Sequence, residues 1–320
     1  MAPSRDAVLL VTVSYDQTAE TVERALRSAG ARPFRLNTDE FPASVEATLD
    51  ERGEFVLYAG GGEISSREVR AVWYRRHSSP NLPDDLDADY REFAERESRA
   101  FLTGTVLCLG DDVRWVSHPT ALWSAEKKPF QLRVAAALGL RIPMTRITNR
   151  PADVQVLAQR GPLVAKAVSS GYILRGHRFD AIFTSEVGAT DLIDLSSLNL
   201  APVTFQEQVA KRSDVRVTVV GSRIFAAEIL SQEHPSSRVD WRATELADLP
   251  HRALELPAQL EQKCHELLST LRLRFGAIDL IRTDDDTYWF LEINPNGEWL
   301  WIEHALGYPI AAAIASELLG

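Results

Sequence analysis

The chain has 320 residues, of which 45% are apolar and 25% are charged, enough to build one domain with large lobes or two domains. Its formal net charge of −10 argues against nucleic acid or an anionic membrane as a partner of the whole surface. The two cysteines, Cys108 and Cys264, form neither a zinc motif nor a disulfide framework. No signal peptide or membrane span stands out, so we expect a soluble cytoplasmic protein.

The first residues predict a β-α-β unit. Residues 7–13 are a continuous apolar run typical of a buried parallel strand, and residues 17–29 have one apolar helical face that ends at Gly30. Residues 34–36 and 71–74 add further short apolar strands. Such units build parallel sheets with right-handed crossovers, so an α/β domain is expected.

Residues 45–66 predict a small antiparallel excursion around a run of three glycines at 60–62. A triple glycine also suits a phosphate-binding loop, but the G-x-x-x-x-G-K-[ST] pattern and a following helix are both missing. We therefore interpret it as a hairpin turn. A long charged helix is expected over 84–109.

The pattern changes near residue 118, where we place a domain boundary. Residues 1–117 would form a Rossmann-like domain, and residues 118–320 a second domain with α+β lobes. We divide this second domain into a central lobe at about 118–208 and a C-terminal lobe at about 209–320.

A polar alternation interrupts an aromatic strand near the C-terminus. The segment Y-W-F-L-E-I-N, residues 288–294, places Glu292 and Asn294 on one face. Residues 276–281 form the preceding strand, and a two-residue turn at 285–286 would pair Asp279 with Glu292 across a hairpin.

The same register places Thr283 opposite Tyr288. Two carboxylates and an amide oxygen, from Asp279, Glu292 and Asn294, would then converge on one side of the sheet. These are ligands that suit Mg²⁺. The alternative is a solvent-facing row of polar groups, but the apolar flanks indicate burial, and unpaired buried carboxylates are costly.

Two lysines occupy positions in the expected helices and strands that suggest a function. Lys128 lies early in a helix expected over 124–138, and Lys166 interrupts the apolar strand P-L-V-A-K-A-V. Burying an ammonium group needs an anion, which phosphate could supply. An exposed lysine at a strand end is the alternative, and Lys127 could replace Lys128.

The loop after that strand, S-S-G-Y, is small enough for Ser169 and Gly171 to fold over phosphates with their backbone amides. A plain flexible turn is equally compatible. Further on, Asp214 and Arg216 share one face of an apolar strand. An acid there can bind ribose hydroxyls and an arginine can bind phosphate, although a cross-strand salt bridge explains both as well.

Taken in order, these residues resemble the ATP-grasp superfamily, in which two lobes clamp ATP behind an N-terminal pre-ATP-grasp domain. The resemblance covers residues 118–320 and implies ATP and Mg²⁺ as cofactors. It implies nucleotide contacts at Lys128, Lys166, Ser169, Gly171, Gln206, Glu207, Val209 and Asp214. It implies metal ligands at Asp279, Glu292 and Asn294, and catalytic roles for Lys128, Lys166 and Arg216.

A narrower resemblance covers essentially the whole chain. V-W-Y-R-R (72–76), K-x-x-Q-L (128–132), I-P-x-T-x-I-T-N (142–149) and F-L-E-I-N-P-N-G-x-W-L-W-I-E (290–303) are similar to the microviridin-type graspetide ligases. This resemblance implies a ribosomal precursor peptide, a leader plus an acidic core, as the partner. A side-chain carboxylate would be activated as an acyl phosphate and captured by a Ser, Thr or Lys side chain to close an ester or amide ring.

The substrate side is less determined. Arg75 and Arg76 could attract acidic side chains of the core peptide, or they could form solvated or interface salt bridges. Asn296 and Trp299 could shape an acceptor pocket, and packing explains Trp299 equally well. Whether the chain forms a homodimer is left open.

Other functions fit the same residues. A RimK-type ligase or a small-molecule carboxylate–amine ligase would share every nucleotide contact. A phosphotransferase that stops at phosphate transfer, or a peptide-binding protein without turnover, belongs to a different class. The complete acid and lysine set argues against a protein without turnover.

Overall fold

The computed structural model describes residues 5–169, 171–175, 178–245 and 249–320. Its N-terminal part is a four-stranded parallel sheet in the order β2-β1-β6-β7. The strands are β1 (Ala7–Thr12), β2 (Arg32–Asn37), β6 (Val69–Tyr74) and β7 (Arg114–Val116). Helix α1 (Gln17–Ser28) joins β1 to β2, which confirms the predicted β-α-β unit.

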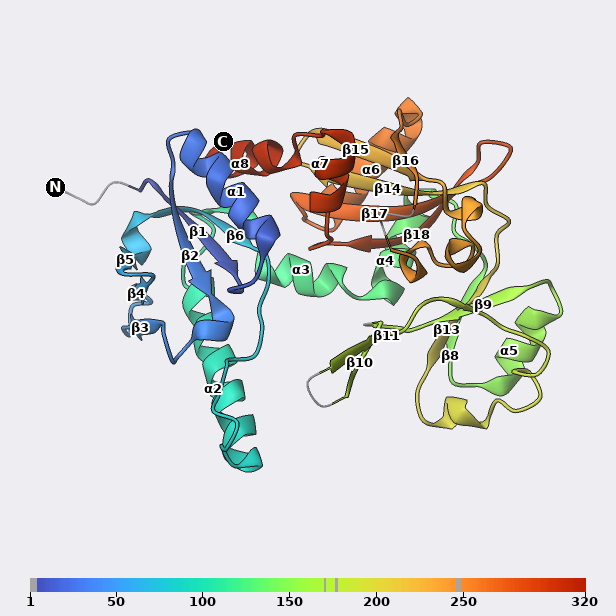
Figure 1. The fold of residues 1–320 in the computed structure, drawn as a ribbon, viewed down its shortest axis with the longest axis horizontal. Coiled ribbons are helices and arrows are strands. Elements are labelled where there is room, and N and C mark those ends of the chain that lie inside the picture. The colour runs from blue at the N-terminus through green and yellow to red at the C-terminus, as the bar shows by residue number, and fades with distance from the viewer. Residues whose placement is uncertain (1–4, 170, 176–177, 246–248) are drawn as a thin grey trace.

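The predicted antiparallel excursion is also present. It comprises β3 (Glu46–Leu49), β4 (Phe55–Ala59) and β5 (Gly62–Ser65). Gly60 and Gly61 form the β4–β5 turn with φ of 58° and 77°, a conformation that favours glycine, so the hairpin interpretation is confirmed. Helix α2 (Ala88–Leu107) projects away from the sheet in Figure 1.

One predicted helix is divided in two. Instead of a single helix over 124–138, the chain forms α3 (Pro119–Ala125) and α4 (Lys128–Ala137). Pro129 explains the break, because a proline has no N–H to donate within a continuing helix and is suited to the first turn of a new one. Lys128 therefore occupies the first turn of α4.

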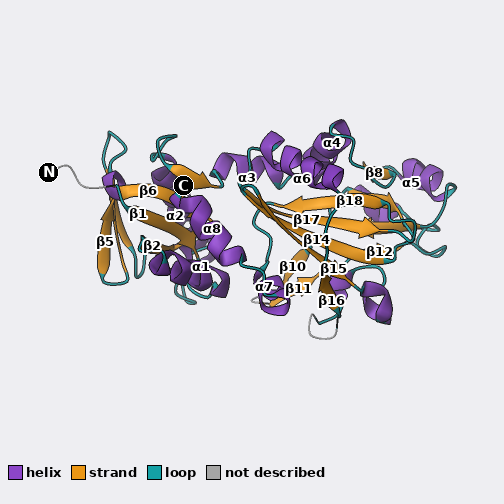
Figure 2. Ribbon diagram, turned by 90° about the horizontal axis from the view of Figure 1, so that it is seen from above, coloured by secondary structure: helices purple, strands orange, loops and turns teal. Residues whose placement is uncertain are grey.

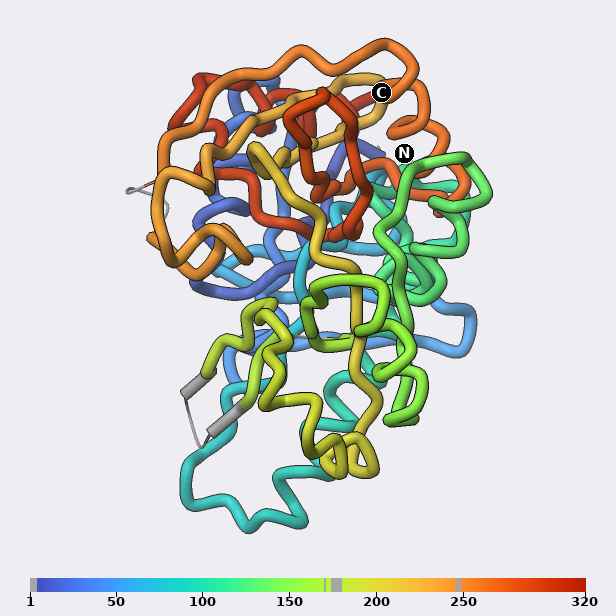
Figure 3. Tube along the Cα trace, turned by 90° about the vertical axis from the view of Figure 1, so that its right-hand side faces the viewer, coloured from blue at the N-terminus to red at the C-terminus, as the bar shows by residue number. Residues whose placement is uncertain are grey.

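The central lobe contains a four-stranded antiparallel sheet in the order β12-β9-β13-β8. Its elements are β8 (Thr145–Thr148), α5 (Pro151–Ala158), β9 (Leu163–Lys166), β12 (Ser185–Glu186) and β13 (Val203–Glu207). A separate hairpin of β10 (Tyr172–Arg175) and β11 (Arg178–Ala181) follows β9. Figure 3 shows this green-to-yellow lobe beneath the orange and red C-terminal lobe.

The C-terminal lobe is built on a five-stranded antiparallel sheet in the order β16-β15-β14-β17-β18. Its strands are β14 (Ser213–Val220), β15 (Arg223–Ile229), β16 (His251–Ala253), β17 (Phe275–Arg282) and β18 (Tyr288–Asn294). Its helices are α6 (Ala258–Thr270), α7 (Leu300–Leu306) and α8 (Ile310–Leu319). Short 3₁₀ turns lie at Thr38–Glu40, Ser66–Glu68, Ser196–Asn199, Ser231–Glu233, Pro235–Ser237 and Trp241–Ala243.

The two faces of this sheet differ in chemistry. Val215, Val217, Ile278 and Leu280 belong to the core that includes α4 and α6. The residues between them along β14 and β17 point to the other face, where Arg216 is the partner of Asp279. Strand alternation thus separates an apolar face against the helices from a polar face toward the central lobe.

The C-terminal helix α8 returns to the N-terminal part of the chain. It packs against α1, β6 and β7, and in Figure 2 it lies beside α1. Ile310 and Ile314 of α8 share one core with Val22 and Leu26 of α1. The core beside the N-terminal sheet therefore includes residues from the far end of the chain.

Candidate active site

The β17–β18 hairpin pairs Asp279 with Glu292, as the sequence predicts, but the turn that joins the two strands differs from the predicted one. The expected two-residue turn is wrong, because Arg282 rather than Thr283 lies opposite Tyr288. Thr283 N–H donates to Thr287 O at 3.0 Å, which closes a three-residue loop that ends at Asp286 with φ of 59°.

A β-bulge compensates for this one-residue slip. Leu280 pairs with Phe290 while Asp279 pairs with Glu292, so Leu291 is the extra residue on β18. The N–H of Phe290 donates to Arg141 O at 2.7 Å, outside the hairpin. The bulge brings both Leu291 and Glu292 into the wall of one cavity, which a regular strand would not do.

Glu292 lines the same cavity as both predicted lysines. Lys128 Nζ lies 3.0 Å from Glu292 Oε2, and the two side chains are 22% and 19% exposed. Burial lowers the pKa of Lys166 to about 8, although Glu292 works to raise it. Burial also works to raise the pKa of Glu292, but Lys128 and Lys166 outweigh this effect, and the pKa of Glu292 is lowered.

Asp279 is held by the predicted arginine. Arg216 Nη1 donates to Asp279 Oδ2 at 2.7 Å, and Arg216 is 6% exposed. Burial raises the pKa of Asp279 despite this arginine. The cross-strand salt bridge anticipated for Arg216 is therefore real, and its partner is a candidate metal ligand. The hairpin cluster, as we name it, consists of Lys128, Lys166, Arg216, Asp279 and Glu292.

Asn294 is placed less favourably for a metal than its neighbours. It is the partner of Ala277, and its Oδ1 accepts a hydrogen bond from Asn296 N–H at 3.0 Å. Among the described residues no group of three or more His, Cys, Asp or Glu side chains could hold a metal ion. Two facing carboxylates still fit Mg²⁺, which usually takes one or two carboxylates and fills its other positions with phosphate oxygens and water.

The segment 206–209, which leads from the end of β13 toward β14 and which we name the hinge, lines a neighbouring cavity. Gln206, Glu207 and Val209 border it together with Lys166 and Leu291. Gln206 Nε2 donates to Thr145 Oγ1 at 2.8 Å, and Glu207 N–H donates to Met144 O at 2.9 Å. The N–H of Val209 has no partner within the described part of the chain, so it is free to meet a ligand.

Asp214 faces the cavity of the hairpin cluster, but with a partner that the sequence did not indicate. Lys211 Nζ lies 2.7 Å from Asp214 Oδ2, and both side chains are 6% exposed. Burial raises the pKa of Asp214 in spite of this lysine. The same lysine lines the hinge cavity, which places Asp214 between the two cavities.

The predicted small-residue loop is only partly at the site. Gly171 lines the cavity of the hairpin cluster, where a Cβ would lie 2.8 Å from Ile182 O, so a side chain there would displace the backbone of the following hairpin. Ser169 is exposed and lines none of the cavities described. Ser170 lies outside the described residues.

Three cavities follow one another between the lobes. The hinge cavity and the cavity of the hairpin cluster, about 60 Å³ each, share Lys166 and Leu291. The second of these shares Trp241 and Arg242 with a cavity of about 660 Å³ that extends to Arg76 in the N-terminal part. The clefts thus form one path from the hinge to the N-terminal domain, with the hairpin cluster in the middle.

The four predicted substrate residues separate in the structure. Arg76 lines the large cavity and is half-exposed, with 40% of its side chain accessible. Arg75 is 1% exposed and its Nη2 lies 2.7 Å from Glu298 Oε1 across the domain boundary, which supports the interface salt bridge rather than a peptide contact. Trp299 is fully buried in the core, so packing explains it. Asn296 accepts a hydrogen bond from Arg75 through its backbone oxygen.

Sequence reasoning missed Asp240 and Arg242, which line the site from an irregular loop. The side chain of Arg242 donates two hydrogen bonds to Asp240 and its backbone N–H donates a third, while Thr184 N–H of the central lobe donates a fourth at 2.9 Å. Burial works to raise the pKa of Asp240, but these bonds lower it to about 2. The D-W-R sequence in a segment without periodicity was the only signal.

Gln131 of the K-x-x-Q-L motif positions the site, a role that the sequence did not indicate. Its Nε2 donates to Ala125 O and to Ile293 O, the latter at 2.7 Å, and its Oε1 accepts from Ile293 N–H at 3.1 Å. This buried amide joins α4 to β18, and it therefore sets Lys128 beside Glu292. An amide on an otherwise apolar helix face is the signal that could have identified it.

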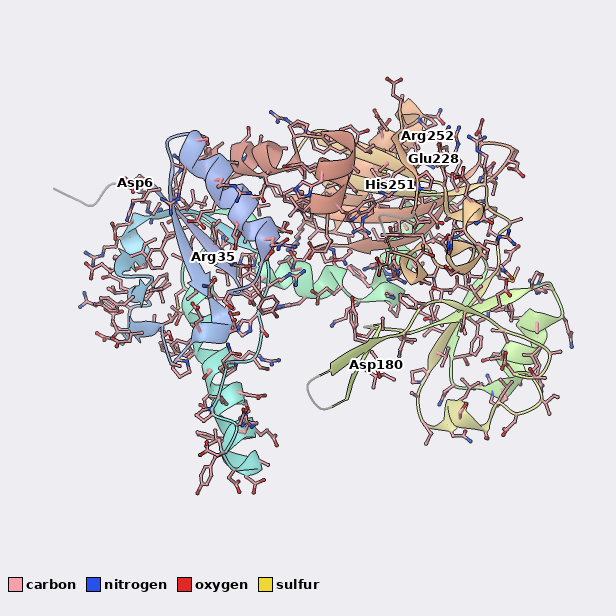
Figure 4. The ribbon with its side chains drawn as sticks, viewed as in Figure 1. Asp6, Arg35, Asp180, Glu228, His251 and Arg252 are labelled. Atoms are coloured by element: carbon pink, nitrogen blue, oxygen red, sulfur yellow. The ribbon has the colours of Figure 1, made fainter. Side chains whose placement is uncertain are left out.

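A second ion-pair network on the same sheet has a different position. Glu228 is fully buried, and Arg252 Nε donates to it at 2.6 Å. Because Glu228 pairs with Val215 on β14, its side chain shares the apolar face rather than the face of Arg216. Figure 4 shows Glu228, His251 and Arg252 together at the outer strands.

The chain resembles known proteins along its whole length. Residues 7–122 match the family model of the MvdD pre-ATP grasp domain. The macrocyclase MdnC of Microcystis aeruginosa, solved bound with precursor peptide MdnA, is 34% identical with a TM-score of 0.87, over 98% of this chain and 99% of that one. The chain belongs to the microviridin-type family of ATP-grasp ligases.

Other members of this ATP-grasp family align equally fully. The macrocyclase MdnB of Microcystis aeruginosa is 33% identical with a TM-score of 0.82, over 98% of this chain and 99% of that one. A RiPP-associated ATP-grasp ligase of Chryseobacterium gregarium, in complex with ADP and a leader and core peptide, is 29% identical with a TM-score of 0.90, over 98% and 96%.

A curated relative is more distant. Beta-citrylglutamate synthase B of Danio rerio is 25% identical over 217 residues, which are 64% of this chain. The matched segment spans half the length of that relative. None of the helices that the structure describes is long and apolar enough to cross a membrane.

Proposed function

We propose that this chain is an ATP-dependent peptide macrocyclase. It transfers the γ-phosphate of ATP to an Asp or Glu side-chain carboxylate of a ribosomal precursor peptide, and it closes an ester or amide ring with a Ser, Thr or Lys side chain of the same peptide. The observation that carries this proposal is the path of cavities, in which the hairpin cluster separates a hinge cavity from a large cavity of about 660 Å³.

The nucleotide occupies the hinge side of the path. The free N–H of Val209 and the hinge at Glu207 receive the adenine, and Asp214 lies where the ribose would be. Lys128 and Lys166 reach the phosphates from two different elements, α4 and β9. The phosphates would add negative charge to that of Glu292, which favours the charged form of Lys166.

Asp279 and Glu292 would hold Mg²⁺, with Asn294 as the third predicted ligand. Bound there, the ion would supply positive charge against the negative charge that develops during phosphoryl transfer. Arg216 contributes a fixed guanidinium on the same face of the sheet, because Asp279 already holds it in place at 2.7 Å.

The large cavity receives the peptide. Tyr15, Phe183, Trp241 and Trp301 give it aromatic walls, while Arg76 supplies a half-exposed cation for an acidic side chain. A peptide carboxylate bound there would lie next to the phosphates of ATP at Arg242, which lines both the large cavity and the cavity of the hairpin cluster. One of its oxygens attacks the γ-phosphorus and ADP leaves as the leaving group.

Ring closure follows in the same enclosed space. A hydroxyl or amine of the peptide attacks the acyl carbon, loses its proton, and phosphate departs. The central lobe bonds to the C-terminal lobe through Thr184 and Asp240, and this closed contact keeps out water that would hydrolyse the acyl phosphate. Ligand sites usually measure about 300–1,000 Å³, so the small hinge-side cavities imply that the lobes separate to admit ATP.

We propose no partner other than the precursor peptide. The net charge of −10 argues against nucleic acid as a partner of the whole surface. Both cysteines are free, and we propose the reducing cytoplasm as the location of the protein. We assign no surface to a homodimer.

A small-molecule carboxylate–amine ligase is the second candidate, because the citrylglutamate synthase aligns with 64% of the chain. The two candidates differ in acceptor. Purified protein, ATP, Mg²⁺ and a precursor peptide with an acidic core should yield ADP and a loss of one water per ring, read by mass spectrometry. AMP, or a phosphopeptide as the final product, would contradict the proposal, and turnover of citrate with glutamate but not of peptide would favour the second candidate.

A further inference from the structure

Glu298 connects the N-terminal domain to the active site through its side chain. Thr18 Oγ1 donates to Glu298 Oε2 at 3.0 Å, and Arg75 Nη2 lies 2.7 Å from Oε1. Arg76 pairs with the same oxygen. All three partners belong to the N-terminal domain, whereas Glu298 belongs to the segment between β18 and α7.

The backbone of the same residue holds the active-site arginine. Glu298 O accepts a hydrogen bond from Arg216 Nη2 at 3.2 Å, while Nη1 of that arginine donates to Asp279 at 2.7 Å. The approach is close: a Cβ on Gly297 would lie 2.5 Å from Arg216 Nη2 and 2.5 Å from the Cβ of Ala277. Only glycine allows the segment to reach the guanidinium.

The N-terminal groups are themselves fixed. Asp16 accepts hydrogen bonds from Thr18 N–H and Ala19 N–H at the start of α1, and it lies 3.2 Å from Arg75 Nε. Arg75 directly follows the C-terminal end of β6, and Asp16 lies in the turn between the C-terminal end of β1 and helix α1. We name the set of Asp16, Thr18, Arg75, Arg76 and Glu298 the interface cluster.

We propose that Glu298 is a positioning residue through which the packed N-terminal domain orients Arg216 for phosphoryl transfer. The proposal rests on the proposed macrocyclase function. The other members of the interface cluster hold the side chain of Glu298 in place, and this fixes the position of its backbone carbonyl. That carbonyl in turn accepts the hydrogen bond from Arg216 Nη2. A guanidinium with both nitrogens bound cannot rotate away from Asp279.

The test compares Glu298→Ala with Glu317→Gln. Glu317 is the matched control, because it also joins two arginines across the N-terminal and C-terminal parts, Arg114 and Arg274, at 2.9 Å each. It has no contact with Arg216. We expect Glu298→Ala to lower kcat for ring closure by about 10–100-fold with KM for ATP within about twofold, and Glu317→Gln to change kcat by less than about twofold.

Two further variants separate positioning from general damage. Thr18→Val removes one neutral hydrogen bond and should lower kcat in the same direction but by only about threefold. In a double-mutant cycle, Glu298→Ala added to Arg216→Lys should lower kcat by less than about twofold beyond Arg216→Lys alone, because the carbonyl then lacks its normal partner.

A ligand-free readout accompanies the kinetics. In hydrogen–deuterium exchange of the free protein, Glu298→Ala should speed exchange over residues 294–299, and Glu317→Gln should not. Unchanged exchange, equal kinetic losses in both variants, additive loss in the cycle, or a rise in peptide KM alone would overturn the proposal. A wild-type enzyme that releases no ADP with peptide would instead refute the macrocyclase function, and the exchange result would still decide the positioning role.

Discussion

The hairpin cluster and the interface cluster contain the same kinds of side chains but differ in how their charges are matched. The interface cluster pairs two arginines with two carboxylates, and Arg75 and Asp16 are only 1% and 3% exposed. The hairpin cluster has three cations for two carboxylates, and it borders a cavity with side chains such as Lys128 that are about a fifth exposed. The interface cluster is balanced in charge and holds the domains together, although Arg76 and Glu298 are 40% and 45% exposed beside the large cavity. The hairpin cluster has an excess cation beside a cavity and can receive an anion.

The largest expected effect is on catalysis in the hairpin cluster. Glu292→Gln keeps the shape of the side chain but removes its charge, so kcat for ring closure should fall by about 10²–10³-fold or more while the free energy of unfolding changes by less than about 1 kcal/mol. Peptide mass spectrometry and urea unfolding measure the two. Asp284→Asn, in the exposed turn of the same hairpin, is the control and should retain activity. Full activity of Glu292→Gln would remove Glu292 from the site.

The corresponding change in the interface cluster should act on stability. Asp16→Ala leaves Arg75 buried with one carboxylate fewer, and we expect the free energy of unfolding to fall by about 3–5 kcal/mol. Asp87→Ala is the control, because Asp87 also caps a helix, α2, but without an arginine, and it should cost about 1 kcal/mol. Equal losses in the two variants would show that the ion pair contributes nothing beyond the cap.

A smaller effect is expected at the join between α4 and β18. Gln131→Leu leaves the N–H and the carbonyl of Ile293 without their partner, so unfolding should become easier by about 1–3 kcal/mol. Gln262→Leu, on the exposed face of α6, should leave stability nearly unchanged. A Gln131 variant as stable as the wild type would mean that Lys128 is positioned by other contacts.

The smallest effect concerns pH. The pKa of Lys166 in the free protein is about 8, below its ordinary value, so the unfolded chain binds more protons between pH 8 and about 10.5 and this residue's contribution to stability rises with pH there. Phosphate binding favours the ammonium form, so ATP affinity measured without metal should fall about tenfold between pH 7 and pH 9.

Calorimetry in two buffers should show the matching proton uptake above pH 8. Lys166→Arg, which keeps its charge, should lose this decline. A wild-type affinity that is flat over the same range would place Lys166 away from the phosphates.

Sequence pattern predicted the parts of this molecule that depend on local chemistry. The β-α-β unit and the glycine turn follow from apolar runs and turn residues. The sequence predicts the pairing of Asp279 with Glu292 from a two-residue turn, and the structure reaches it instead through a three-residue loop and a bulge. The bulge at Leu291 does not follow from the sequence pattern, because it is stabilised by Arg141, a contact 149 residues away along the chain.

Long-range burial explains the other differences. Arg75 and Arg76 are adjacent in sequence and both pair with Asp16 and Glu298, yet Arg75 is 1% exposed and Arg76 is 40% exposed and lines the large cavity. No local pattern distinguishes them. Trp299 is similar, since whether an aromatic residue lines a pocket or fills a core depends on segments such as α8 that fold back from elsewhere.

The central claim is that a peptide carboxylate is activated as an acyl phosphate. The direct measurement uses a precursor peptide whose Asp and Glu side-chain carboxylates carry oxygen-18, incubated with enzyme, ATP and Mg²⁺. The claim predicts that each ring closed releases one inorganic phosphate with a single oxygen-18 atom, while the other label stays in the new ester or amide carbonyl. Ring closure that yields unlabelled phosphate would contradict it.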